Sequence, residues 1–446
     1  MKFKSSLIIL LGLYSFGFSQ NTKIPNRNFE RALIELGIDF INSEPDGFIP
    51  TSRIAGVESL NVAKKLISDL TGIEDFLALK SLNCAYNPIS ELNVSSNSAL
   101  EYLNCSLNLL TSLDVSSNKA LTSLNCSSNL IKNLDLSSNT ALIRLYCGSN
   151  ELTNLDLSFN SQLESLSCTY NNLSTLDLSS NTALIRLYCG SNELTNLDLS
   201  FNSQLESLSC AYNNLSTLDV SFNPVLSTLY CVVNNLDNLN LRSNVALTYL
   251  NCGYNKIASL DVSSNKALID LNCHSNLIKN LDLSNNKSLE LLNCGVNQLN
   301  FLDIRNGNNS IIHEFRAESN PDLKCIFVDD LVYSYNNWAD VVDDNSVFVN
   351  NETECNALII ANNSFNLKLS VVPNPSTNFS KIDLGSKYAN VKVVVFDSLG
   401  RSINEFSFPE IQIINLNLEN FNVGVYFIKI HALNNDKSEI LKFIVK

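Results

Sequence analysis

The chain has 446 residues, and its 44 acidic and 30 basic side chains give a net charge of −14. This surplus of negative charge argues against nucleic acid as the main partner. The length alone indicates about three domains, and a hydrophobic fraction of 45% is ample for buried cores.

Residues 1–20 have the composition of a signal peptide. Lys2 and Lys4 precede an apolar run from Leu7 to Phe18, which is too short to span a bilayer. No other stretch is long and apolar enough to predict a transmembrane segment. We therefore expect the mature chain to be exported.

Residues 21–78 are predicted to form an N-terminal cap and a first irregular repeat. Apolar residues at helical spacing between Asn26 and Gly37 predict a small amphipathic helix that covers the first rung. These residues are Phe29, Ala32, Leu33 and Leu36.

The segment 42–46 has the oxygen spacing of the first half of a calcium loop. The twelfth position of such a loop is Arg53, where calcium loops have a Glu that binds through both oxygens. A turn within the cap is therefore the favoured interpretation, and calcium binding stays the alternative.

A repeat of 21 residues dominates the chain from 79 to 304. Each unit has two half-turns, Leu-x-x-Leu-x-Cys-x-x-Asn and Leu-x-x-Leu-x-Val-x-x-Asn, and a fixed period indicates stacked, nearly identical rungs. Alternation around Leu-x-Cys and Leu-x-Val predicts strands in both half-turns, so we expect a mostly β solenoid with parallel sheets. The recurring cysteines are Cys84, Cys105, Cys126, Cys147, Cys168, Cys189, Cys210, Cys231, Cys252, Cys273 and Cys294.

Two columns of asparagine and one of cysteine are predicted to be structural. The Asn side chain has donors and an acceptor, so each column can bond turn backbone on its own rung and the next. Disulfides between neighbouring rungs are disfavoured because the Cβ vectors would be parallel. We expect buried free thiols, and no metal or cofactor, since a metal site needs converging ligands.

The pattern Leu-x-x-Leu-x-Cys-x-x-Asn-x-Leu resembles the leucine-rich repeat family, in the short bacterial form of internalin-like surface proteins. The resemblance covers about residues 60–304. It implies a parallel sheet on which partners bind.

On the Cys-bearing sheet, the outward positions contain a group of Tyr and Arg residues, which are enriched at binding hot spots. They are predicted to bind a protein or a glycan. The alternative is that Tyr merely shields strand backbone, because residues 140–181 and 182–223 are nearly identical copies. The candidates are Tyr102, Arg144, Tyr146, Arg186, Tyr188, Tyr230 and Tyr249.

The opposite half-turn has a column of aspartates from Asp114 to Asp303, interrupted by Asn240. Oxygen-rich columns suit calcium, but an ordinary solvated face is the favoured interpretation.

The segment 305–357 breaks the period and is predicted to be a C-terminal cap. Its two cysteines, Cys325 and Cys355, are expected to pair as a disulfide in an exported chain. Closing a loop of about 30 residues would contribute roughly 3 to 4 kcal/mol.

After an Asn-rich linker at 358–371, alternating residues in 372–446 predict a small antiparallel β-sandwich. Pro373-Asn-Pro, Asp397-x-Leu-Gly-Arg and Gly424-Val-Tyr resemble the C-terminal sorting domain of type IX secretion cargo in Bacteroidetes-like bacteria. The resemblance implies contact with the type IX machinery and a secreted or outer-surface location.

Catalysis has little support in the sequence. The three histidines, His274, His313 and His431, lie in different regions, and no nucleophile, metalloprotease or phosphate-loop motif occurs. We therefore expect a non-enzymatic, adhesin-like repeat protein, with a structural spacer as the alternative.

Overall fold

The computed structural model describes residues 20–40, 44–356, 369–432 and 437–446. The predicted signal peptide lies outside these residues except for Gln20, as does the predicted linker up to residue 368. By its backbone contacts the chain divides into two compact units, 1–197 and 198–446, and each is described by itself.

The first unit begins with the predicted cap. β1 (Asn21–Lys23) pairs antiparallel with β2 (Phe48–Pro50), and α1 (Arg27–Glu35) and α2 (Thr51–Ile54) complete it. The side chain of Asn26 accepts hydrogen bonds from the N–H groups of Asn28 and Phe29 at 3.1 and 3.0 Å, which caps α1. Leu36 is 48% exposed, contrary to its expected place on the buried face, because α1 ends before it.

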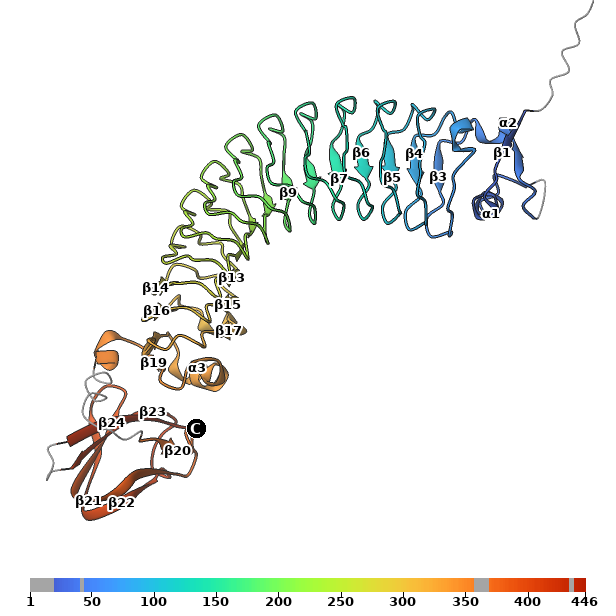
Figure 1. Ribbon diagram of the computed structural model, residues 1–446. Helices are drawn as coiled ribbons and strands as arrows, with labels where there is room; N and C mark the ends of the chain where they lie inside the picture. Colours follow the sequence, from blue (N-terminus) through green and yellow to red (C-terminus); the bar gives the residue numbers. More distant parts are fainter. Residues whose placement is uncertain (1–19, 41–43, 357–368, 433–436) are drawn as a thin grey trace, which may run out of the picture. The chain divides into compact units, whose positions relative to one another are not determined.

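Seven short parallel strands follow in the first unit and lie side by side in chain order (Figure 1). Their central leucines are in register, as Leu145, Leu166 and Leu187 show. A 3-10 helix, η1 (Ile73–Asp75), lies between the first two strands in sequence. The strands are β3 (Ser59–Asn61), β4 (Ser81–Asn83), β5 (Tyr102–Asn104), β6 (Ser123–Asn125), β7 (Arg144–Tyr146), β8 (Ser165–Ser167) and β9 (Arg186–Tyr188).

The second unit continues the same pattern with Cys-bearing strands that are parallel and in register. They are β10 (Ser207–Ser209), β11 (Thr228–Tyr230), β12 (Tyr249–Asn251), β13 (Asp270–Asn272), β15 (Leu291–Asn293) and β17 (Glu314–Arg316).

The second half-turn forms a sheet only near the C-terminal end of the repeats. Four parallel strands make it: β14 (Asn280–Asp282), β16 (Phe301–Asp303), β18 (Cys325–Phe327) and β19 (Val347–Val349). In the earlier described rungs this half-turn contains no named strand, only an isolated bridge between Asn93 and Asp114. The sequence predicted a strand in the second half-turn of each rung. Among the described residues, such strands occur only where β14, β16, β18 and β19 form their sheet.

The C-terminal cap covers the last rung of the second unit. It contains α3 (Leu331–Asn337) and two 3-10 helices, η2 (Asn309–Ile311) and η3 (Ala339–Val341). Trp338 is 2% exposed, and its ring lies 4.7 Å from that of Phe315 on β17. The cap thus buries the apolar end that a solenoid would otherwise expose.

The C-terminal domain is an antiparallel five-stranded sheet: β20 (Val371–Val372), β21 (Phe379–Asp397), β22 (Ser402–Asn417), β23 (Gly424–Ala432) and β24 (Lys437–Val445). The register of β21 and β22 shifts between Asp383 and Tyr388. Residues from both halves of β21, such as Ile382 and Val393, belong to one buried cluster. A single sheet therefore encloses the core, because its two longest strands, β21 and β22, remain paired on both sides of this shift in register.

Candidate ligand-binding surface

Buried residues fix the orientation of the candidate surface. On β7, Leu145 and the following Cys147 are both 0% exposed, whereas Arg144 points outward. All eleven periodic cysteines are free thiols and buried. Burial raises the pKa of the Cys126 and Cys168 thiols to about 12, so these thiols stay neutral and act as small apolar core residues.

The first asparagine column ties each Cys-bearing strand to the rung before it. Asn150 donates to the carbonyls of Cys126 and Cys147 at 3.0 and 3.1 Å, and its oxygen accepts from the Ile131 N–H at 3.0 Å. The second column is bonded less completely. Asn139 donates to the carbonyls of Val115 and Asn118, while its oxygen has no partner among the described residues.

Four of the seven candidates lie together in the first unit. Register places Arg144 and Arg186 on either side of Ser165, and Tyr146 and Tyr188 on either side of Ser167. With strands about 4.8 Å apart, each pair is separated by roughly 9 to 10 Å. We call the side chains of β7, β8 and β9 on the face opposite the buried leucines the Arg/Tyr surface, in which Ser165 is only 4% exposed. Its residues are Arg144, Tyr146, Ser165, Ser167, Arg186 and Tyr188.

The other three candidates do not join this group. Tyr102 lies on β5 between Ser81 and Ser123. In the second unit, Tyr230 and Tyr249 lie on adjacent strands but in different rows, 39% and 40% exposed.

Sequence reasoning missed a further column of tyrosines. These residues stand two positions after a cysteine, are more than half exposed, and have left-handed backbone with φ from 51 to 58°. Tyr254 stacks on His274 with ring centroids 5.2 Å apart. The signal was present, because the column keeps the 21-residue period. In the first unit the tyrosines are Tyr86 and Tyr170, and in the second Tyr212 and Tyr254.

The two arginines of the Arg/Tyr surface are not ion-paired, unlike some other basic residues of the first unit. Lys80 pairs with Glu58 at 2.9 Å, and Lys132 pairs with Glu151 at 3.6 Å. Neither Arg144 nor Arg186 makes an ion pair with any described acidic side chain. Both guanidinium groups are exposed and available to a ligand.

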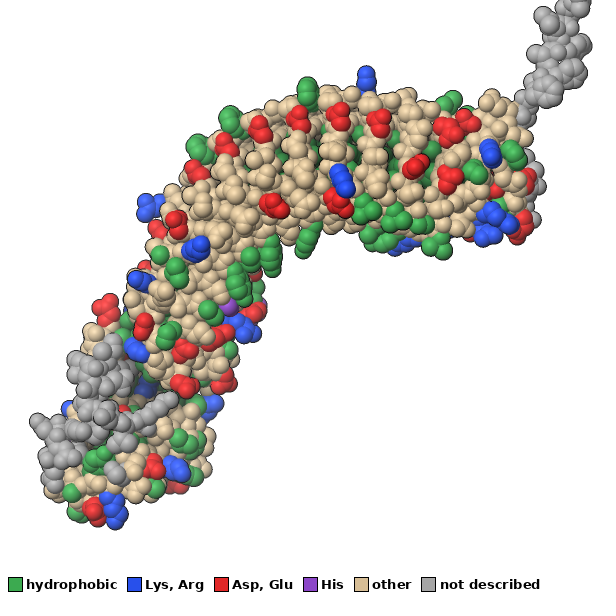
Figure 2. Space-filling view, in the orientation of Figure 1, with side chains coloured by type: hydrophobic (Ala, Val, Ile, Leu, Met, Phe, Trp, Pro, Cys, Tyr) green, Lys and Arg blue, Asp and Glu red, His purple; other side chains and the backbone are tan. Residues whose placement is uncertain are grey.

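The carboxylates of the aspartate column accept hydrogen bonds from backbone N–H groups within their own turns. In the first unit the Asp135 and Asp156 carboxylates each accept from the N–H of the serine two residues later, at 2.9 Å. Hydrogen bonds from these serines lower the pKa of both carboxyls. Figure 2 shows acidic side chains following one another from rung to rung. No three His, Cys, Asp or Glu side chains gather as a metal site would require, within the described ranges.

Part of the proposed calcium loop, residues 42 and 43, lies outside the described residues. At the C-terminal end of this loop, the side chain of the buried Glu30 accepts hydrogen bonds from the N–H groups of Asp46 and Gly47 at 2.7 and 3.0 Å. Burial is the main reason that the pKa of Glu30 is raised. These contacts give the segment a role in the cap.

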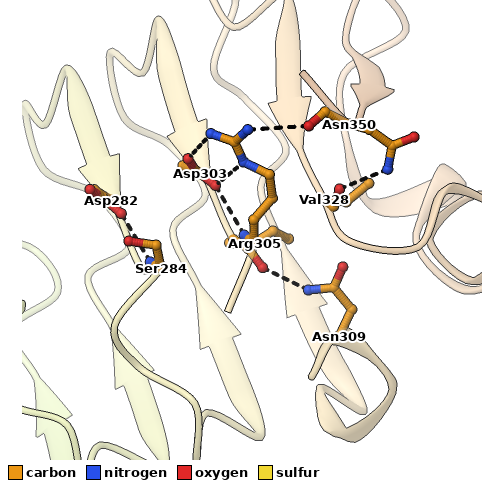
Figure 3. Close-up of polar contacts among 8 residues, drawn as sticks. Asp282, Ser284, Asp303, Arg305, Asn309, Val328 and Asn350 are labelled. Atoms are coloured by element: carbon orange, nitrogen blue, oxygen red, sulfur yellow. Dashed lines mark hydrogen bonds and ion pairs between the residues drawn. The ribbon is translucent and has the colours of Figure 1, made fainter. Parts of the chain in front are cut away.

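The C-terminal cap contains the remaining predicted pair. Cys325 and Cys355 are joined by a disulfide, with Cα atoms 5.9 Å apart. Arg305, after the last aspartate of the column, bonds the Asp303 carboxylate and donates to the Asn350 carbonyl at 3.2 Å (Figure 3). These contacts link the last rung to the cap.

The motifs of the C-terminal domain have structural explanations. Asp397 accepts from the N–H groups of Leu399 and Arg401 at 2.9 Å, and Arg401 Nε donates to its second oxygen at 2.7 Å. Asn374 holds β24 by accepting from the Ile444 N–H at 2.8 Å. The Tyr426 ring stacks on Phe443 within the core.

The family described as secretion system C-terminal sorting domain matches residues 370–446. This segment is a secretion sorting domain. The sorting domain directs the chain to the type IX secretion machinery, so the protein is secreted or attached at the outer cell surface. No helix of the described residues has the length and apolar character needed to cross a membrane.

The rungs that precede the sorting domain have the leucine-rich repeat fold of internalins. The functional domain of InlJ from Listeria monocytogenes, described as including a cysteine ladder, is 24% identical with a TM-score of 0.60, covering 96% of this chain and 99% of that one. InlF from Listeria monocytogenes is 20% identical with a TM-score of 0.60, covering 73% and 95%. No curated protein shows significant sequence similarity.

Proposed function

We propose that this protein recognises a macromolecular partner at the cell surface, in the manner of an adhesin, through its Cys-bearing sheet. The observation that carries the proposal is the register of β7, β8 and β9, which gathers two Tyr and two Arg side chains around serines. Tyr and Arg supply both contact area and directional hydrogen bonds. Buried leucines and asparagine bonds hold them in place before binding, which lowers the entropy cost of association.

Catalysis is not part of the proposal. His274 stacks on Tyr254 and approaches Ser275 Oγ at 3.0 Å, while the neighbouring Cys273 is fully buried. Burial raises the pKa of the Cys273 thiol well above its usual value, which removes it as a nucleophile.

A triple substitution tests the recognition surface. Tyr146 and Tyr188 of the Arg/Tyr surface, together with Tyr230 on β11 of the same Cys-bearing sheet, are each changed to Ser, the residue that the chain has at the equivalent positions 167 and 209. We expect the full chain to lose attachment to cell or environmental surfaces while its thermal unfolding stays unchanged.

A matched control changes the exposed Phe159, Phe201 and Phe222 to Ser, the residue at equivalent positions such as 138 and 180. This control should attach normally. Equal attachment by both triple variants would favour the second candidate function, a structural spacer, which the uniform rungs support.

A further inference from the structure

The Arg/Tyr surface combines charge with periodicity. Arg144 and Arg186 form one row, Tyr146 and Tyr188 a parallel row, and each row has the same spacing of two strands. The rows run across the strands, along the stacking direction of the rungs. A ligand that makes the same contacts with Arg144 and Tyr146 as with Arg186 and Tyr188 must itself repeat at about twice the strand spacing.

We propose that the Arg/Tyr surface binds a linear polysaccharide that carries a carboxylate on alternate sugars. This inference rests on the proposed recognition function and names the class of its ligand. The carboxylates lie on Arg144 and Arg186, since a planar guanidinium can donate two parallel hydrogen bonds to a carboxylate. The sugar rings lie over Tyr146 and Tyr188, whose rings offer an apolar face and a polar tip.

Charge complementarity favours an acidic ligand at this place, although the whole chain is acidic. The outward side chains of β7, β8 and β9 include two arginines and no acid. The aspartate column belongs to the other half-turn, and charges more than about 8 Å away are largely screened at physiological salt.

One acidic residue does lie close by. Glu164 precedes β8, is exposed, and makes no ion pair with a described basic side chain. Its negative charge weakens the attraction, so Glu164→Gln should strengthen binding.

A sugar polymer fits this surface better than an acidic peptide. The backbone groups of β8 are already bonded to strands on both sides, so a peptide cannot extend the sheet there. Sugars also offer many hydroxyl groups, which can bond Ser167 and the tyrosine hydroxyls. A periodic polymer repeats its contacts on both Arg-Tyr pairs, whereas the surface of a globular domain without internal repeats has no such period.

The test measures binding of the full chain to hyaluronan oligosaccharides, which carry a carboxylate on every second sugar, by isothermal titration calorimetry. The comparison ligands are the same oligosaccharides with their carboxylates reduced to alcohols, and polyglutamate. We expect the hyaluronan oligosaccharides to bind, the reduced ones to bind at least roughly tenfold more weakly, and polyglutamate not to compete.

Two matched double variants complete the test. R144Q/R186Q should bind the hyaluronan oligosaccharides at least roughly tenfold more weakly. R242Q/K266Q removes the same charge from exposed positions after the second half-turn and should bind as the native chain does.

The inference is overturned if hyaluronan fails to bind, if R144Q/R186Q binds it equally well, or if polyglutamate competes for the surface. Those results leave the recognition function standing, provided that the triple tyrosine variant still loses attachment. If that variant attaches normally, the recognition function fails as well.

Discussion

Arg305 and Asp303 form a forked ion pair at the end of the aspartate column, with Arg305 Nε donating to Asp303 Oδ1 at 2.9 Å (Figure 3). Asp303 is only 6% exposed, unlike the exposed carboxylates earlier in the column. Its charge is balanced by an arginine that also lies 4.9 Å above the Phe327 ring of β18. The final rung and the cap are therefore coupled through this side chain.

Replacing Arg305 by Gln should destabilise the cap by about 1 to 3 kcal/mol, because a buried carboxylate loses its partner. Fluorescence of Trp338, the only tryptophan, reports unfolding of the cap in urea. The control is Arg316→Gln, whose exposed pairs with Glu314 and Glu318 are worth less than about 1 kcal/mol. An equal loss in both variants would contradict a special role for Arg305.

The two asparagine columns should differ in their contribution to stability. Asn150→Ala removes bonds through both the nitrogen and the oxygen, and we expect a loss of about 3 kcal/mol. Asn139→Ala removes bonds through the nitrogen only and also a buried oxygen without a described partner, so about 1 to 2 kcal/mol is expected. Urea unfolding followed by circular dichroism compares them. A larger loss of stability in Asn139→Ala than in Asn150→Ala would contradict the greater contribution expected of the first asparagine column.

The periodic thiols should resist chemical modification in the folded chain. Burial and a pKa of about 12 for thiols such as Cys126 keep them neutral and inaccessible at pH 8. With a colorimetric disulfide reagent, we expect negligible reaction of the native chain and reaction of all eleven free thiols in guanidinium chloride. Rapid labelling of several thiols under native conditions would disprove the buried column.

Glu439 should make the sorting domain less stable as the pH rises. Burial raises its pKa to about 7, above the value of about 4.3 expected in the unfolded chain. Between these values the unfolded chain has lost the proton that the folded domain still binds, so stability falls as pH increases through this window. Stability is greatest below about pH 4.3 as far as this group is concerned.

Hydrogen exchange of β24 in the intact chain measures this effect, with faster exchange expected at pH 6.5 than at pH 5 after correction for the intrinsic rate. This range stays below the pKa of about 7 to which burial lowers the Lys442 ammonium on the same strand, so Lys442 remains mostly charged throughout. Glu439→Gln should abolish the difference. A pH dependence that persists in this variant would assign the effect to another group.

The sequence alone determined the repeat architecture, because a 21-residue period with inward Leu and Cys permits one consistent register. For the same reason it predicted that Arg144, Tyr146, Arg186 and Tyr188 point outward from alternate rungs. The sequence also predicted the sorting domain from its short motifs. Two motif residues, Asp397 and Asn374, make hydrogen bonds that depend on their residue types.

Only the tertiary structure decided where the second sheet forms. Asn280-Leu-Asp forms strand β14 and Asn133-Leu-Asp forms no strand, although the two segments have the same three residues. Pairing depends on the distance and direction of the neighbouring rung, which these three residues do not encode. The period of 21 residues could have revealed the tyrosine column that includes Tyr170, but not its left-handed backbone. Tyr has no preference for positive φ, so the surrounding rungs impose that conformation and the local sequence gives no sign of it.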